Sequence, residues 1–259
     1  LATPHSSHYD QICAAAASGK HVFVEKPMAL TTADAQQAAQ ACKNAGVVLA
    51  VGHNRRFMAA ATALKSILEG KELGFVLHAE AHFSADSAMH YQADEWRAQR
   101  HEAPGGSLAS LGIHMIDTLT WLFGPITRVA CLSKRKVLCV DIDDTTCALI
   151  EFDSGLTAYL GTLFATPLLS QLRVSGTLGN VVVEQDFCCL TKTTSDGQQQ
   201  AIPLDDTDSV VEEIKAFANS CTSGSPYPVT PRQAAHNVAV MCAMLQSSEF
   251  GGIWTQVER

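Results

Sequence analysis

The residues best suited to chemistry in this sequence are an amine and an imidazole. Lys26 follows the short run Val-Phe-Val-Glu at 22–25 and precedes Pro27, and His114 lies within the apolar run 108–123. An imidazole can take a hydroxyl proton at neutral pH, and a nearby ammonium group can stabilise the alkoxide that forms. Two such groups, if the fold brings them to one site, can together take the proton from an alcohol hydroxyl.

The position of Lys26 suits this chemistry. An apolar run that stops at Lys-Pro predicts a buried strand whose last residue turns out of the sheet, because proline cannot donate to a ladder and restricts the residue before it. Ligands of open α/β sheets collect beyond the carboxyl ends of the strands, and an X-Pro junction also tolerates a cis peptide. Lys26 is therefore a candidate active-site residue. The alternative is an ordinary surface lysine at a strand-to-loop turn.

The run 108–123 predicts a helix that carries further polar groups. Residues three and four apart share a helix face, so we expect Ser110, His114 and Asp117 to project together as one wall of a substrate pocket. Gly105 and Gly106, just before the helix, permit close approach of a ligand to the backbone. The alternative for His114 is a buried helix histidine bonded to Asp117, which we take as structural support.

The elements that position these residues change in kind at about residue 53. Before it, the patterns predict helices at 6–20 and 31–44, the second capped by Thr31 or Thr32, and buried strands at 21–24 and 47–51. Alternation of strand and helix predicts a parallel sheet.

After residue 53 the pattern is typical of an antiparallel sheet with helices to one side. Helices are expected at 57–69, 108–123, 209–220 and 231–247, with a loop at 84–104. Alternating runs predict strands from 75 and at 127–132, 145–152, 156–162, 172–175 and 180–184.

Several segments together resemble the Gfo/Idh/MocA oxidoreductases, the family of glucose-fructose oxidoreductase and inositol dehydrogenase. The resemblance runs nearly the whole chain. It rests on the order and spacing of Ala-Thr-Pro-His-Ser-Ser-His at 2–8, Val-Phe-Val-Glu-Lys-Pro at 22–27, Val-Gly-His-Asn-Arg-Arg-Phe at 51–57, Glu-Trp-Arg at 95–97, the segment 104–117, and shorter motifs at 143–144, 152–155, 176–179 and 228–230.

This resemblance implies a fold of class α/β plus α+β. Residues 1–53 would be the C-terminal part of a dinucleotide-binding Rossmann domain, a remnant of its parallel sheet. Residues 54–259 would be a larger α+β substrate-binding and oligomerisation domain with a predominantly antiparallel open sheet, whose last helices pack back on the first part. None of the 17 glycines forms the G-x-G-x-x-G fingerprint that holds the cofactor pyrophosphate, so we expect the front of the Rossmann domain to be missing from this chain.

The resemblance also implies the reaction and its residues. Family members transfer hydride between nicotinamide and a sugar or polyol carbon, and a Lys, a His and an Asp four residues before the His handle the proton. Here Lys26 and His114 are present, but Ser110 stands at the position of the Asp. Serine cannot serve as a carboxylate, so both an altered substrate and a weakened enzyme follow as expectations.

The cofactor is expected to be NAD or NADP, although its binding by this chain alone is doubtful and the residue that would distinguish the two is missing. The expected cofactor-binding residues are Thr3, Pro4, His8, Glu25, Lys26, Pro27, Asn54 and Arg55. The substrate is expected to contact His114, Trp96 and Arg97, whose planar fork suits a carboxylate or a pair of hydroxyls. A surface arginine with its stem on Trp96 is the alternative.

Composition restricts the binding partners and the cellular compartment that we expect. A net charge of −8 argues against nucleic acid and anionic membrane as partners, and no apolar run reaches the 18 residues of a membrane span. Nine cysteines without a C-x-x-C pair predict a reduced, cytoplasmic protein. His78, Glu80 and His82 share a strand face that could bind zinc, but a polar outer sheet face explains them, and we predict no metal.

Two classes of function remain. In the first, the intact gene product is an NAD(P)-dependent sugar or polyol oxidoreductase, and this chain alone is expected to be inactive. In the second, the chain is a non-catalytic binding or assembly module that retains the substrate domain. In either case the resemblance implies a homo-oligomer, a dimer or tetramer, formed through the C-terminal sheet.

Overall fold

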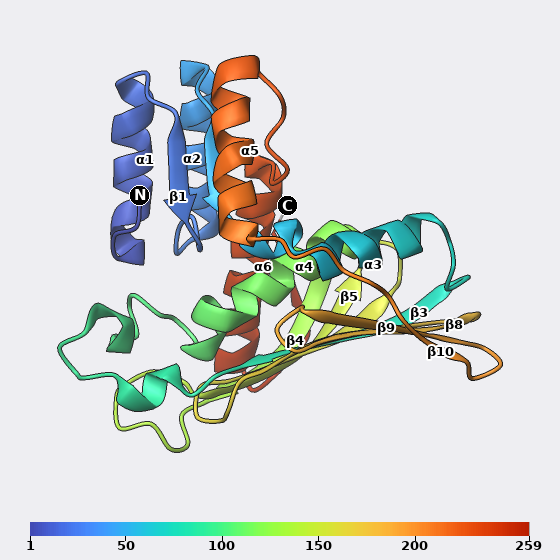
Figure 1. Ribbon diagram of the computed structural model, residues 1–259. Coiled ribbons are helices and arrows are strands. Elements are labelled where there is room, and N and C mark those ends of the chain that lie inside the picture. Colours follow the sequence, from blue (N-terminus) through green and yellow to red (C-terminus); the bar gives the residue numbers. More distant parts are fainter. Residues whose placement is uncertain (259) are drawn as a thin grey trace.

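The smaller part of the molecule is a parallel pair of strands covered by helices. The computed structural model describes residues 1–258. In Figure 1 the smaller part contains the N-terminus, with α1 and α2 beside β1. Strands β1 (Val22–Glu25) and β2 (Leu49–Gly52) pair parallel, with Val22 opposite Leu49. The surrounding helices are α1 (His8–Ala17), α2 (Thr32–Ala45), α5 (Ser209–Ser223) and α6 (Pro231–Glu249).

Local sequence explains these elements. All four residues of β2 are buried, as expected for a parallel strand covered on both faces. The Thr31 side chain accepts a hydrogen bond from the Asp34 amide, which confirms one of the two predicted caps of α2. Helix α5 returns from the far end of the sequence, and its Phe217 ring lies 5.6 Å from that of Phe23 in β1.

The larger part is built on a wide sheet. Within residues 1–258 this sheet has nine strands in the order β10-β9-β8-β7-β3-β6-β5-β4-β11. The β3 and β6 strands pair parallel, whereas the other neighbours pair antiparallel. The strands are β3 (Val76–Ser84), β4 (Ile126–Lys134), β5 (Thr145–Phe152), β6 (Thr157–Leu163), β7 (Leu169–Gly176), β8 (Gly179–Glu184), β9 (Cys189–Thr194), β10 (Gln199–Ala201) and β11 (Thr255–Gln256).

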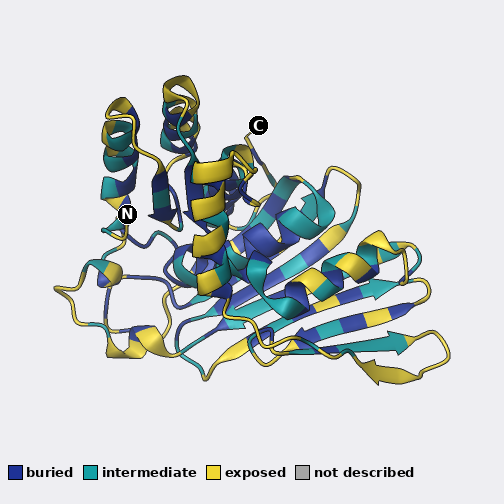
Figure 2. Cartoon of the chain, turned by 45° about the horizontal axis from the view of Figure 1, so that its top comes forward, coloured by how far each residue is buried: buried dark blue, intermediate teal, exposed yellow. Residues whose placement is uncertain are grey.

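Helices cover one face of this sheet. Figure 1 shows α3 (Ala59–Glu69), α4 (Ile113–Phe123) and α6 on the same side of the strands. Burial alternates along β5, β7 and β8, so one set of side chains meets the helices and the other set faces outward, as the alternating colours of the strands in Figure 2 show. The predicted combination of a parallel pair and a mainly antiparallel open sheet is confirmed. None of the described helices is long and apolar enough to cross a membrane.

A second, smaller hydrophobic cluster supports the long segment between β3 and α4. Its largest member is Phe164, and Tyr91 and Leu111 pack at its edge. The buried members are Ala88, Ala98, Ala103, Leu138, Val140, Ile142 and Phe164. The segment 85–104 is therefore anchored by apolar contacts, and it also contains two short 3-10 turns, Ser87–His90 and Trp96–Ala98, within the predicted loop.

Several predicted boundaries were wrong. The expected helix 108–123 consists of a π-helical turn, Leu108–Gly112, followed by α4, and the first strand of the large sheet runs through Ser84 instead of ending before it. Strands β9, β10 and β11 were not predicted. Each is at or near a sheet edge and lacks an alternating apolar pattern; all three residues of β10 are exposed.

The start of the π-helical turn generates a prediction about glycine. Gly106 has φ +51°, and a Cβ there would lie 2.0 Å from the carbonyl oxygen of Asp143. We expect Gly106→Ala to destabilise the protein by about 1–3 kcal/mol beyond the conformational cost of a left-handed alanine, because this backbone cannot yield without moving the helix start. Urea denaturation measures the loss. Gly19→Ala is the control, because Gly19 has φ +65° but open space around it. Equal losses in the two variants would contradict the argument.

Candidate active site

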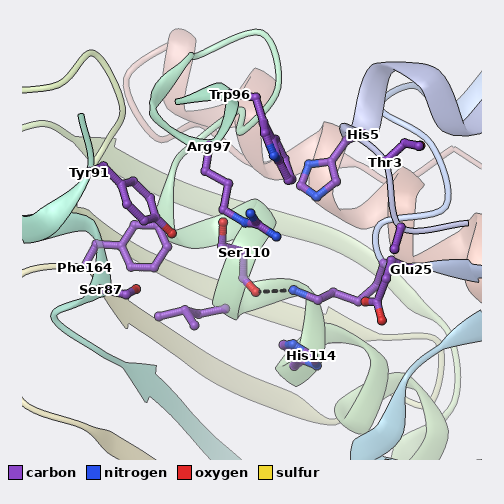
Figure 3. A pocket seen from close by; sticks show the side chains of 13 residues that line it. Thr3, His5, Glu25, Ser87, Tyr91, Trp96, Arg97, Ser110, His114 and Phe164 are labelled. Carbon is purple, nitrogen blue, oxygen red and sulfur yellow. Dashed lines mark hydrogen bonds between the residues drawn. The ribbon is translucent and has the colours of Figure 1, made fainter. Parts of the chain in front are cut away.

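A cavity of about 280 Å³ lies where the two parts of the molecule meet, and Figure 3 shows the side chains around it. It opens beside the carboxyl end of β1 and is bounded by the π-helical turn, α4 and the segment 85–104. Its lining residues are Ala2, Thr3, His5, Glu25, Lys26, Ser87, Tyr91, Trp96, Arg97, Ser110, Leu111, His114 and Phe164.

Lys26 enters this cavity from the end of β1. Its Nζ donates a hydrogen bond of 2.7 Å to the backbone carbonyl of Ser110, 84 residues away in the sequence, and the peptide bond to Pro27 is cis. Burial lowers the pKa of Lys26 to about 8, against the opposing effect of the Glu25 carboxylate and with smaller contributions from Arg97 and Arg55. The amine is thus still mainly protonated at neutral pH but can lose its proton in mildly alkaline solution.

Ser110 and His114 face the cavity from the same helix, in an irregular stretch of it. In the π-helical turn the amide of Ile113 reaches the carbonyl of Leu108, five residues back instead of four. His114 follows in the first turn of α4, with its ring 5.9 Å from that of Phe83. Within the described residues its Nδ1 is buried without a hydrogen-bond partner.

The protonation state of His114 follows from its surroundings. Burial lowers its pKa well below the ordinary value, and the positive charges of Lys26 and Arg55 lower it further. His114 is therefore a neutral imidazole at pH 7, the form that can accept a proton.

Asp117 does not belong to the polar wall of the cavity, and this prediction was wrong. Its two carboxylate oxygens accept hydrogen bonds of 2.8 and 2.7 Å from Arg56, and Asn237 of α6 donates a third of 2.7 Å. Asp117 and Asn237 are fully buried, and Arg56 is only 3% exposed. The alternative of a bond between His114 and Asp117 is also not observed, because His53, at 3.9 Å, is the histidine nearest this carboxylate.

The residues expected along the cofactor are only partly brought together. Thr3, Glu25 and Lys26 line the cavity. His8 lies behind it, fully buried, with its ring nitrogens 2.9 Å from the carbonyl oxygen of Pro27 and 3.1 Å from that of Thr3. His8 thus ties the N-terminal loop to the turn after Lys26. Pro4 precedes a 3-10 turn in the same loop and is not among the lining residues.

Asn54 and Arg55 are engaged elsewhere. The Asn54 amide donates to Ser209 at the start of α5. The Arg55 guanidinium is buried, donates to Asp186 at 2.8 Å and to Ser170 at 3.1 Å, and lies over the Phe83 ring. Neither residue lines the cavity, although both follow the carboxyl end of β2 as the sequence predicted, and their contact with a cofactor stays a prediction. All three bonds are to partners more than 100 residues away, which no local pattern indicates.

Trp96 and Arg97 do reach the cavity, from the segment 85–104. The Arg97 guanidinium stacks 4.1 Å from the centre of the Trp96 ring, and the edge of the His5 ring meets the same indole at 4.9 Å. In Figure 3 the guanidinium extends toward the Ser110 side chain. These positions fit the predicted substrate contacts, although the stacking expected for an ordinary surface arginine is present too.

Glu102 was not predicted, yet it joins the two sides of the cavity. Its carboxylate accepts bonds from the Ser6 amide at 2.9 Å and the Ser6 hydroxyl at 2.5 Å, and its carbonyl oxygen lies 2.6 Å from His5 Nδ1. Glu102 is 5% exposed, which is rare for a glutamate that does not have such partners. No signal in the sequence links residues 96 positions apart, so sequence reasoning could not find this contact.

No cluster of three or more histidine, cysteine or carboxylate side chains in residues 1–258 is arranged to hold a metal ion. In the row His78, Glu80 and His82, the first ring bonds to Thr157 and the third to Ser84. These observations are those of a polar sheet face.

Comparison with known proteins identifies the family. Residues 1–53 match the NAD-binding Rossmann-fold model of the Gfo/Idh/MocA oxidoreductases, and residues 61–182 match the model of a C-terminal domain of the same family. The two matches together cover well over half of the chain. This protein belongs to the Gfo/Idh/MocA oxidoreductase family, a family of NAD(P)-dependent enzymes.

Individual relatives agree with this. The chain is 27% identical to 1,5-anhydro-D-fructose reductase of Ensifer adhaerens, over 97% of its own length and 77% of the relative's. It is 29% identical to D-xylose 1-dehydrogenase (NADP(+)) 2 of Haloferax volcanii, over 96% and 77%. The structure of a putative NADPH-dependent oxidoreductase from Desulfitobacterium hafniense superposes with a TM-score of 0.93 at 29% identity, covering 98% of this chain and 78% of the other.

The site fits the nicotinamide end of such a cofactor. The cavity adjoins the carboxyl end of β1, the place where dinucleotide folds bind their ligand. The His114 ring lines this cavity, and its Nδ1 is buried without a hydrogen-bond partner among the described residues. Thr3, Glu25 and Lys26 are the residues that would border the nicotinamide, which on binding accepts or supplies hydride.

The Asp117 cluster generates a prediction about stability. Asp117→Asn removes the charge but keeps the shape, leaving the Arg56 guanidinium buried without a carboxylate. We expect a loss of about 3–5 kcal/mol in the free energy of unfolding at pH 7, measured by urea denaturation. Asp206→Asn, which removes an exposed carboxylate, is the control and should change stability by less than about 0.5 kcal/mol. Similar losses in both variants would show that the buried ion pair contributes no more to the free energy of unfolding than an exposed carboxylate does.

Proposed function

We propose that the protein transfers hydride between a nicotinamide cofactor and the hydroxyl or carbonyl carbon of a sugar or polyol, with His114 and Lys26 handling the proton. The observation that carries the proposal is their convergence on one cavity from β1 and α4. Membership of the family supports hydride transfer as the reaction, and relatives that are named for sugar substrates support the substrate class.

The proposed steps follow from the protonation states. In the oxidation direction the neutral His114 accepts the hydroxyl proton, and the ammonium of Lys26 stabilises the developing alkoxide. In the reduction direction the same proton returns to the carbonyl oxygen. The hydrogen bond from Lys26 to the Ser110 carbonyl holds the amine in place, so in this proposal Ser110 acts through its backbone at the position where the family has an Asp.

The proposal includes the remaining expectations for the site. Thr3, Glu25 and Lys26 would contact the cofactor directly, with Pro4, His8 and Pro27 shaping that loop, and Trp96 and Arg97 would contact the substrate. We also propose a division at residue 53 between the cofactor part and the substrate part, and action in a reducing compartment such as the cytoplasm, because all nine cysteines are free thiols.

A non-catalytic binding or assembly module is the second candidate. The observation that favours it is Ser110, since the imidazole of His114 has no carboxylate to orient it and its Nδ1 has no partner among the described residues. Turnover distinguishes the two candidates: a module of this kind would bind a sugar but would not transfer hydride with either NADH or NADPH.

Removal of either proposed proton-transfer group should reduce turnover. We expect Lys26→Met and His114→Asn each to lower kcat by about 10²-fold or more, and to weaken cofactor affinity far less, because general acid–base groups act in the chemical step. The measurements are steady-state kinetics and fluorescence titration with NADH. Lys20→Met and His78→Asn are matched controls away from the cavity and should keep full activity. Retained kcat in either site variant would contradict the assigned role.

The pKa of Lys26 sets the pH dependence. Because burial lowers it from 10.5 to about 8, the free protein loses this charge as the pH rises through 8. We expect kcat/KM to fall above about pH 8 and the fall to be absent in the residual activity of Lys26→Met. A profile that stays flat to pH 10 would contradict the role of the ammonium form.

The uncovered face of the large sheet suits self-association, and we propose a homo-oligomer, a dimer or tetramer, formed through it. Leu132, Leu149 and Leu169 are 44–53% exposed on this face. We expect light scattering after gel filtration to give a multiple of 27.7 kDa, and Leu149→Glu to yield monomers by placing a charge in the contact. Val210→Glu, at an exposed residue of α5, is the control. A monomeric unmodified protein at tens of micromolar would contradict the proposal.

A further inference from the structure

The charged side chains around the cavity are mainly positive. Of its lining side chains, two are cations, Lys26 and Arg97, and one is a carboxylate, Glu25. His5 and His114 add no charge at neutral pH, because burial lowers the pKa of His5 to about 4 and that of His114 well below its ordinary value. Thr3, Ser87, Tyr91 and Ser110 contribute hydroxyl groups to the remaining polar lining.

The single carboxylate lies to one side. An added Cβ on Gly52, in the neighbouring strand β2, would lie 3.5 and 3.6 Å from the two carboxylate oxygens of Glu25, so this group lies against the backbone of β2. Figure 3 shows it directed away from Arg97 and Ser110. The half of the cavity between Arg97 and Lys26 therefore contains positive charge without a facing carboxylate.

Of the two cations that line the cavity, Arg97 is the one whose charged group has no hydrogen-bond or ion-pair partner among the described residues. Within residues 1–258 no hydrogen bond or ion pair of its guanidinium is found, and its contact is the stacking on Trp96. By contrast Lys26, the other cation of the cavity, donates to the Ser110 carbonyl. Stacking fixes the plane of the guanidinium and leaves its N–H groups available, an arrangement that suits a bidentate contact with an anion.

We propose that the substrate is an anionic monosaccharide or polyol, a sugar acid whose carboxylate binds Arg97 while Lys26 and His114 act on a hydroxyl carbon. This inference rests on the proposed function and adds the substrate class to it. A volume near 280 Å³ lies just below the usual range of ligand pockets, and the nicotinamide would take part of it, so the substrate is limited to one sugar unit. The hydroxyls of Ser87 and Tyr91 are the groups on hand to bind sugar oxygens.

The test measures binding directly, by isothermal titration calorimetry of the full chain with and without NAD⁺. The probes are D-glucuronate, D-galacturonate and D-gluconate, each beside its neutral counterpart D-glucose, D-galactose or D-glucitol, and D-glucose 6-phosphate as a phosphate ester. We expect at least one acid to bind about tenfold or more tightly than its counterpart, and added salt to reduce the difference.

Two variants locate the effect. Arg97→Gln should abolish the preference for the acid by weakening binding of the acid far more than binding of the neutral sugar, and in turnover it should raise KM for the acid more than it lowers kcat. Arg232→Gln removes an equal charge from an exposed position of α6, outside the cavity, and should retain the preference. A preference for glucose 6-phosphate that depends on Arg97 would support the anion site and assign it to phosphate esters.

Other outcomes overturn the inference. Affinity for the acids and the phosphate ester no higher than for the neutral sugars, no binding of any of these anions, or a preference that survives Arg97→Gln would each do so. Turnover of neutral polyols without a preference for acids would leave the proposed function standing and remove only this inference. Anion binding at Arg97 without hydride transfer between the cofactor and any probe would leave the anion site standing and contradict the proposed function.

Discussion

The buried carboxylate of Asp117 is the constraint on which the geometry of the site depends. Asp117 belongs to α4, Arg56 follows β2, and Asn237 belongs to α6, so one ion-pair cluster fixes three elements from distant parts of the sequence. Arg56 also donates to the carbonyl of Pro228, just before α6. Because His114 lies one turn before Asp117 on α4, this cluster determines how far the imidazole stands from the end of the parallel sheet, and hence from Lys26.

A second constraint acts at the other end of the same helix. The π-helical turn brings the Ser110 carbonyl to Lys26, and the resulting bond joins the end of β1 to the start of α4. A carboxylate beside this amine would favour its charged form, whereas a carbonyl is a weaker partner, which agrees with burial dominating the pKa of Lys26. The electrostatics of the site thus depend on a backbone group, which the identity of the residue at 110 does not reveal.

The sequence was informative wherever local rules decide the outcome. The Thr31 cap, the parallel pair and the position of Lys26 at the end of its strand follow from turn chemistry and hydrophobic periodicity. Failures occurred where partners are distant. Helical spacing grouped Asp117 with Ser110 and His114, but a buried arginine 61 residues away binds it. Arg55 does follow a strand as predicted, but no local pattern indicates its bonds to Asp186 and Ser170 in the larger part. Edge strands such as β10 have no apolar pattern to read.

The two halves of the site therefore differ in how they are held. Lys26 directly follows β1 and is held by its bond to the Ser110 carbonyl, and His114 is on α4, which the Asp117 cluster fixes; such rigid support is what the proposed reaction requires. Trp96 and Arg97 are on the segment 85–104, which is attached by its own small apolar cluster and by the bonds of Glu102 to Ser6. A change within this segment can alter the charge and shape of the pocket without disturbing the Asp117 cluster or the proposed proton-transfer pair. In the proposed function, substrate choice can thus vary independently of the chemistry.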